Sequence, residues 1–208
     1  SPDLGHTNPG DLVMFVGDGR FHIESTMIKN PHLTFYQYNP YTNKFTHEIY
    51  DTEQMMGIRK AEVEKAKSAK MFGIILGTLG RQGSTTILQE IENLMMKNNR
   101  DYIVVFLSEI NPQKLLKFEE VDAWVQIACP RLSIDWGHHC LKPLLNTYEA
   151  FTCLNEIEWQ PVYPMDYYSD QGGKWSNYFA KNEEAKLRKE KKGLLKKNRQ
   201  QTEVKYES

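Results

Sequence analysis

The sequence has no apolar run of the roughly 20 residues that a membrane-spanning helix requires. It starts at Ser1-Pro2 and lacks the basic and then apolar pattern of a signal peptide. Cysteine is scarce, and Cys129, Cys140 and Cys153 are an odd, irregularly spaced set that argues against a disulfide framework. We therefore expect a cytoplasmic chain without a membrane partner, in which at least one cysteine is a free thiol or a metal ligand.

A charge excess of one sign is also missing, since the formal net charge is -1. The average charge therefore indicates no direct nucleic-acid partner. The Lys/Glu-rich segment from Lys181 to Gln201 favours a solvated helix or a disordered tail, with a basic surface for RNA or an acidic partner as the alternative. With 40% hydrophobic and 25% charged residues, the chain has an ordinary globular composition and suffices for one large or two small cores.

Strand patterns begin after a turn-rich opening, residues 1–11, which indicates a leader or linker. The continuous apolar run Leu12–Val16 predicts a strand buried on both faces of a parallel sheet. We expect a loop that bears Arg20 and His22 to follow it. Further short strands are predicted near Thr34–Tyr38 and Phe45–Tyr50.

Helices and strands then alternate along the chain. Residues 51–70 are good helix formers with Asp51 or Thr52 as the N-cap. The next expected elements are a strand Met71–Gly77, a helix capped by Ser84, a strand Tyr102–Leu107, a short helix Pro112–Leu116, a strand Val121–Ala128, a helix Thr147–Glu156 and a wrapping loop Trp159–Trp175. The β-α-β-α-β order requires parallel strands, so we predict an α/β fold with mainly parallel sheets flanked by helices.

Unusual motifs follow the ends of three of these strands. They are Thr78-Leu79-Gly80-Arg81-Gln82-Gly83, Ser108-Glu109 and Cys129-Pro130-Arg131. Ligands bind at the carboxyl edge of parallel sheets, so the three motifs are expected to converge on one crevice. Gly77, Gly80 and Gly83 match neither a dinucleotide fingerprint nor a phosphate loop. A structural tight turn is one interpretation, and the polar tip formed by Arg81 and Gln82 favours the other, ligand binding.

Cys129 is the candidate for chemistry, because it ends a buried strand and lies beside Arg131, whose charge would favour the thiolate. A thiolate is a nucleophile or a soft-metal ligand. The alternative is an inert buried cysteine, which we assume for Cys140 and Cys153. A zinc site at His138-His139-Cys140 is disfavoured, since no second ligand pair has zinc spacing.

Several long blocks resemble one family. They include Gly17-Asp18-Gly19-Arg20-Phe21-His22, Leu76-Gly77-Thr78-Leu79-Gly80-Arg81-Gln82-Gly83, Ala128-Cys129-Pro130-Arg131-Leu132-Ser133-Ile134-Asp135-Trp136-Gly137 and Tyr163-Pro164-Met165-Asp166. In order, from about Leu12 to Tyr168, they look like the C-terminal half of the first subunits of the 2-(3-amino-3-carboxypropyl)histidine synthase family, the diphthamide biosynthesis enzymes.

The resemblance implies a radical S-adenosylmethionine transferase that modifies a histidine of translation elongation factor 2. In this family three related α/β domains each contribute one cysteine to a 4Fe-4S cluster. By its motif Cys129 corresponds to the third-domain ligand, and the other two are expected upstream of Leu12. Gly80, Arg81, Gln82 and Gly83 would seat S-adenosylmethionine, and Arg131 is a further cofactor-binding candidate. No catalytic residue is assigned. Arg20, His22 and Asp135 fit loop anchoring as well as a site role.

The resemblance also divides the chain and names its partners. Residues 12–50 would end the middle domain, 51–168 would form the third domain, and 169–208 would be a C-terminal loop and charged tail. The implied partners are a homologous second subunit, an electron-donor protein and elongation factor 2. A subunit-docking and substrate-recognition module without cofactor binding is the alternative, and a dehydratase resembling quinolinate synthase is a third option that the residue blocks do not support.

Overall fold

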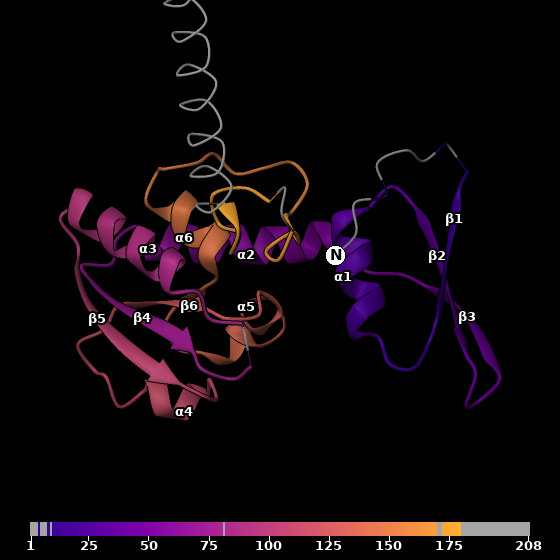
Figure 1. Cartoon of the computed structure of the whole chain (residues 1–208), viewed down its shortest axis with the longest axis horizontal. Helices are drawn as coiled ribbons and strands as arrows, with labels where there is room; N and C mark the ends of the chain where they lie inside the picture. Colours follow the sequence, from indigo (N-terminus) through magenta and orange to yellow (C-terminus); the bar gives the residue numbers. More distant parts are fainter. Residues whose placement is uncertain (1–3, 5–7, 9, 81, 170–171, 180–208) are drawn as a thin grey trace, which may run out of the picture.

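The computed structural model describes residues 4, 8, 10–80, 82–169 and 172–179. It is an α/β protein with two sheets that lie side by side and are connected by a long helix, α2 (Thr52–Ala66) (Figure 1). The predictions for Arg81, for most of the expected leader and for the segment from Lys181 to Gln201 fall outside the described residues. No helix in the described part of the chain is both long and apolar enough to cross a bilayer.

The first sheet has the order β1-β2-β3, formed by β1 (Leu12–Val16), β2 (Thr34–Asn39) and β3 (Lys44–Glu48). β1 pairs with β2 in parallel, and β2 pairs with β3 antiparallel. The connection from β1 to β2 contains helix α1 (Phe21–Lys29), where the sequence had indicated only a loop. Ile23 and Met27 of α1 pack on Phe35 of the sheet, so the helix exists because it buries this apolar stripe.

The prediction that Leu12–Val16 is buried on both faces is wrong. Leu12, Met14 and Val16 are 65%, 61% and 63% exposed, and only the alternate residues Val13 and Phe15 pack on the α1 side. The apolar run correctly indicated a strand. Burial of β1 on both faces would require other residues to cover its second face, and none of the described residues does so.

The second sheet is parallel throughout and has the order β5-β4-β6-β7. Its strands are β4 (Met71–Gly77), β5 (Asp101–Leu107), β6 (Ala123–Ile127) and the short β7 (Leu144–Leu145). This confirms the predicted parallel β-α-β-α-β order, to which β7 is an addition that the sequence did not indicate.

Helices cover both faces of the second sheet. Phe72, Ile74 and Leu76 of β4 belong to a core shared with α2, α3 (Thr85–Lys97) and α6 (Thr147–Cys153). On the opposite face, Ile75 and Trp124 pack with residues of α4 (Pro112–Leu115) and the loop after it. The middle of β4 and all of β6 are therefore buried, as expected for central strands covered on both faces.

The C-terminal part wraps around this core. Tyr163, Met165, Tyr167 and Trp175 are buried in the large core, which confirms the expected wrapping loop. Helix α5 (Arg131–Trp136) and the 3-10 turn η1 (Gly137–His139) were not expected, and they carry the chain from the end of β6 back towards β7.

Candidate functional site

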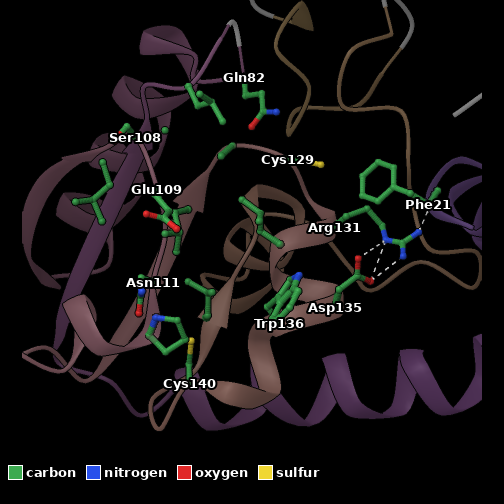
Figure 2. Close-up of a pocket in the computed structure, with 18 residues that line it drawn as sticks. Phe21, Gln82, Ser108, Glu109, Asn111, Cys129, Arg131, Asp135, Trp136 and Cys140 are labelled. Atoms are coloured by element: carbon green, nitrogen blue, oxygen red, sulfur yellow. Dashed lines mark hydrogen bonds and ion pairs between the residues drawn. The ribbon is translucent and has the colours of Figure 1, made fainter. Parts of the chain in front are cut away.

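A cavity of about 540 Å³ opens at the carboxyl ends of β4, β5 and β6. Its lining includes Leu79 and Gln82 after β4, Ser108 and Glu109 after β5, and Cys129 after β6 (Figure 2). The expected convergence of the three loops on one crevice is thus confirmed. The cavity lies where parallel α/β sheets bind ligands.

Two glycines give the loop after β4 its shape. Gly80 has a φ of +63°, a conformation that L-residues with a side chain rarely adopt. At Gly83 a Cβ atom would stand 2.3 Å from the carbonyl oxygen of Gly77, so the loop folds back tightly onto the strand that it leaves. The Ser84 hydroxyl then accepts a hydrogen bond from the Ile87 amide, as expected for the N-cap of α3.

Cys129 stands at the rim of this cavity on a loop held by buried hydrogen bonds. The side chain of Gln126, which is fully buried, donates to the Cys129 carbonyl at 2.9 Å and to the Ser133 hydroxyl at 3.1 Å. Pro130 follows as the N-cap residue of α5. The thiol itself is half-buried and lines the cavity, so it is neither sealed in the core nor remote from the glycine loop.

Arg131 acts on the Cys129 thiol in the expected direction, since its charge favours the thiolate, but burial outweighs it. Burial raises the pKa of the Cys129 thiol, and the backbone amide and charge of Arg131 only partly offset this effect. The nearby Asp135 carboxylate acts in the same direction as burial. A metal ligand at this position would release its proton on binding the metal.

Arg131 is occupied by other protein groups. Its Nε donates to both carboxylate oxygens of Asp135 at 2.9 Å, and Nη2 donates to Glu24 at 2.6 Å. Nη1 donates to the Phe21 carbonyl at 3.0 Å. Asp135 therefore anchors the Arg131 side chain. Arg20 is an anchor of the same kind, because it forms ion pairs with Glu24 and with Glu48. Direct cofactor binding by Arg131 stays a prediction.

Phe21, Trp136 and Cys140 are among the cavity residues that were not assigned to the site from the sequence. Phe21 comes from α1, the helix that packs on the first sheet. Trp136 ends α5, and Cys140 follows the turn η1. Cys129 and Cys140 occupy different parts of the lining, with Trp136 between them in the view of Figure 2. Phe21 and Trp136 were part of the family-like blocks, but nothing in their spacing indicated a common cavity. His22 packs edge-on against Phe21 at 5.3 Å between ring centroids.

The candidate metal ligands in this chain fit a metal centre to which the chain contributes one ligand, rather than a complete metal site. Within residues 10–80, 82–169 and 172–179 no three or more His, Cys, Asp or Glu side chains form a group that could hold a metal ion. A 4Fe-4S cluster is held by cysteine thiolates, and Cys129 presents a single thiol at the open edge of the sheet. The ring centroids of His138 and His139 are 3.9 Å apart, with the two rings tilted by 41°.

Comparison with known proteins identifies the family. The family model described as "Putative diphthamide synthesis protein" matches residues 1–164. The chain therefore belongs to this family of diphthamide synthesis proteins, as the sequence blocks had indicated.

Relatives with curated names give the same result. The chain is 55% identical over 178 residues to "2-(3-amino-3-carboxypropyl)histidine synthase subunit 1" of Dictyostelium discoideum, covering 86% of this chain and 38% of that protein. It is 48% identical over 179 residues to the protein of the same name from Homo sapiens, covering 83% of this chain and 41% of that protein. The chain thus spans about two-fifths of the length of these relatives.

A solved structure supports the fold. The crystal structure of Dph2 from Pyrococcus horikoshii with a 4Fe-4S cluster matches with a TM-score of 0.61 and 27% sequence identity, covering 77% of this chain and 45% of that chain. A second crystal structure of the same protein matches with a TM-score of 0.60 and 28% identity. The α/β architecture with its parallel sheet is therefore that of known diphthamide proteins.

Proposed function

We propose that this chain is the C-terminal part of a 3-amino-3-carboxypropyl transferase, which modifies a histidine of translation elongation factor 2 in the first step of diphthamide biosynthesis. The observation that carries the proposal is the position of the Cys129 thiol, which lines a cavity at the carboxyl ends of three parallel strands together with the glycine-rich loop. The relatives named synthase subunit 1 support the same reaction.

Cys129 would be one of the cysteine ligands of a 4Fe-4S cluster, with the others outside this chain. The crystallised relative with such a cluster supports this assignment. When bound, the cluster would supply the electron that cleaves S-adenosylmethionine. Cys129 is suited to the ligand role because Gln126 fixes its backbone while the thiol stays accessible from the cavity. The other cluster ligands, and with them the activity, belong to the whole protein.

The remaining lining would bind and enclose the cofactor. Gln82 and Asn111 offer amide groups, and Ser108 a hydroxyl, around a lining that is otherwise largely apolar (Figure 2). In our proposal Gly80, Arg81, Gln82 and Gly83 seat the carboxylate or ribose of S-adenosylmethionine. Apolar neighbours such as Leu107 and Leu132 exclude water and so strengthen polar contacts.

The proposed partners are those of the complete enzyme. They are a homologous second subunit, an electron-donor protein and elongation factor 2, all in the cytoplasm. The name "subunit 1" carried by the relatives supports a multi-subunit assembly. Since the chain spans about two-fifths of their length, we expect it to be inactive alone.

The ligand assignment is tested by Cys129→Ala in the full-length protein, reconstituted with iron and sulfide under anaerobic conditions. We expect loss of the cluster absorbance, because a thiolate ligand is removed. Iron and acid-labile sulfide are measured alongside. Cys140→Ala is the matched control, since Cys140 lines the same cavity and should be dispensable. Cys153→Ala serves as a second control. Full iron loading in Cys129→Ala would defeat the proposal.

The exposed apolar face of the first sheet favours a second candidate, a subunit-docking and substrate-recognition module. Size-exclusion chromatography with the second subunit, combined with a titration of S-adenosylmethionine, distinguishes the two functions. Subunit binding without any cofactor affinity in the reconstituted full-length complex would favour the docking module.

A further inference from the structure

Arg131 follows Cys129 by two residues, and its side chain is only 5% exposed. We infer that Arg131 is a positioning residue: it clamps the Cys129 loop to helix α1, and this joint sets how the thiol faces the cavity. The inference deepens the proposed function and rests on it, because it concerns the presentation of the same thiol. It assigns Arg131 a role other than direct contact with a cofactor.

The hydrogen bonds of Arg131 account for all of its donors. A guanidinium has five N–H groups, one on Nε and two on each Nη. Nε faces Asp135, Nη1 donates to the Phe21 carbonyl at 3.0 Å and the Ser25 hydroxyl at 3.3 Å, and Nη2 contacts Glu24 at 2.6 Å and Asp135 at 2.9 Å. With this geometry no N–H group is left to bind a ligand.

These bonds join parts of the chain that are far apart in sequence. Phe21, Glu24 and Ser25 belong to α1, which packs on the first sheet. They are separated from Arg131 by 106 to 110 residues in the sequence. Asp135 lies one turn further along α5, the same helix as Arg131. The guanidinium therefore ties the start of α5, and with it the Cys129 loop, to a helix on the other sheet.

The same side chain also places one wall of the cavity. The Arg131 guanidinium lies 4.9 Å from the centroid of the Phe21 ring, a cation–π distance, and Phe21 lines the cavity that contains the Cys129 thiol. Figure 2 shows Phe21 and the Asp135–Arg131 contacts beside Cys129. A displaced Arg131 would move both the thiol and the ring.

The charge of Arg131 is neutralised within the joint. Asp135 and Glu24 flank it, and Glu24 is shared with Arg20, which also contacts Glu48. The chain of five charges alternates in sign from α5 through α1 to β3. Because these carboxylates hold the guanidinium in place, we assign Arg131 a geometric effect on Cys129 in addition to that of its charge.

The test uses Arg131→Lys in the full-length protein. Lysine keeps the positive charge, but its single nitrogen cannot reach Asp135, Glu24 and the Phe21 carbonyl together. In the metal-free protein we expect the alkylation rate of Cys129 to change several-fold relative to that of Cys140, followed peptide by peptide with mass spectrometry. In the reconstituted protein we expect a changed electron paramagnetic resonance spectrum of the reduced cluster.

Arg20→Gln is the matched control. Arg20 belongs to the same chain of charges but is half-exposed, and it does not line the cavity. Its loss should leave the Cys129 to Cys140 alkylation ratio and the spectrum unchanged.

Glu24→Gln is the second variant, which removes one carboxylate anchor on α1 while Arg131 and Asp135 stay in place. It should shift the ratio in the same direction as Arg131→Lys, and it decides the question if Arg131→Lys does not fold.

Two results would overturn the inference. A lower unfolding midpoint with an unchanged alkylation ratio and spectrum would show that Arg131 only stabilises the fold. Weaker S-adenosylmethionine binding with an unchanged ratio would show direct contact with the cofactor. Failure of the proposed function is separate, because it would appear as iron retention in Cys129→Ala, whereas the alkylation ratio is measured without metal.

Discussion

Cys153 lies in a different environment from the two cysteines that line the cavity. It is 4% exposed at the end of α6, inside the large core. Burial raises the pKa of its thiol to about 11. At pH 8 only about one molecule in a thousand would carry the reactive thiolate there, even before access is considered.

We therefore predict that iodoacetamide labels Cys129 and Cys140 in the metal-free native protein at pH 8 while Cys153 stays unlabelled until urea unfolds the chain. Peptide mass spectrometry after timed quenching measures each site. The sign of the linked pH effect follows from the raised pKa. The thiol pKa in the unfolded chain is about 8.5. Below this pH the buried neutral thiol makes its full contribution to the stability of the fold, and this contribution is lost as the pH rises towards 11. Labelling of native Cys153 as fast as Cys140 would contradict the prediction.

At the scale of elements, the open face of the first sheet is the most unusual surface. Met14 and Val16 of β1 are more than half exposed, and on the neighbouring strands Tyr36 stacks on Phe45 at 5.1 Å between ring centroids. The register places Met14 opposite Tyr36, and Tyr38 between Val16 and Phe45. A contiguous apolar face of this kind promotes association with another surface.

A double change of Met14 and Val16 to lysine should reduce self-association of the 208-residue chain, because it places charge on the apolar face. The unfolding midpoint should hardly change, since exposed side chains lose little burial. Static light scattering over a concentration series and thermal unfolding measure the two effects. The control is Val13→Lys, which adds charge to the same strand on the face that packs on α1, and it should lower the midpoint strongly. Equal unfolding midpoints for the two proteins would contradict the assignment of the faces.

The same elements show what the sequence predicts and what it does not. Apolar runs correctly predicted β1 and β4, and β6 was also predicted correctly, because a strand can be recognised from the local sequence pattern alone. Burial of β1 on both faces was wrong, since coverage is a tertiary property. Helix α1 was missed although Ile23 and Met27 have helical spacing, because the preceding glycines of Gly17–Gly19 favoured a loop.

The candidate site was predicted in part. The strand ends correctly placed Gln82 and Cys129 on one cavity, because parallel strands share a carboxyl edge. The participation of Phe21 could not be predicted, since it depends on how α1 docks beside α5. The neutralised charge of Arg131 depends likewise on Glu24, which is distant in sequence.

At the scale of the whole molecule, a buried network ties the connecting helix to the C-terminal segment. Arg59 of α2 is 1% exposed and donates through Nε and Nη2 to the two carboxylate oxygens of Glu149, each at 2.7 Å. It also donates to the Leu144 carbonyl of β7. Glu149 accepts a hydrogen bond from the Tyr163 hydroxyl, and it completes the capping box of α6 with Asn146. The network therefore spans α2, β7, α6 and the wrapping loop.

Arg59→Met should lower the free energy of unfolding by about 3 to 5 kcal/mol, because it leaves the Glu149 carboxylate buried and unpaired. Urea unfolding at neutral pH, followed by far-UV circular dichroism, gives this value. Adding Glu149→Leu to Arg59→Met removes the unpaired charge and should recover part of the loss, although the capping box of α6 is lost with it. If the double variant were less stable than Arg59→Met by the full cost of Glu149→Leu alone, the two side chains would be energetically independent. The bidentate pair would then not be what holds α2 to the C-terminal half of the fold.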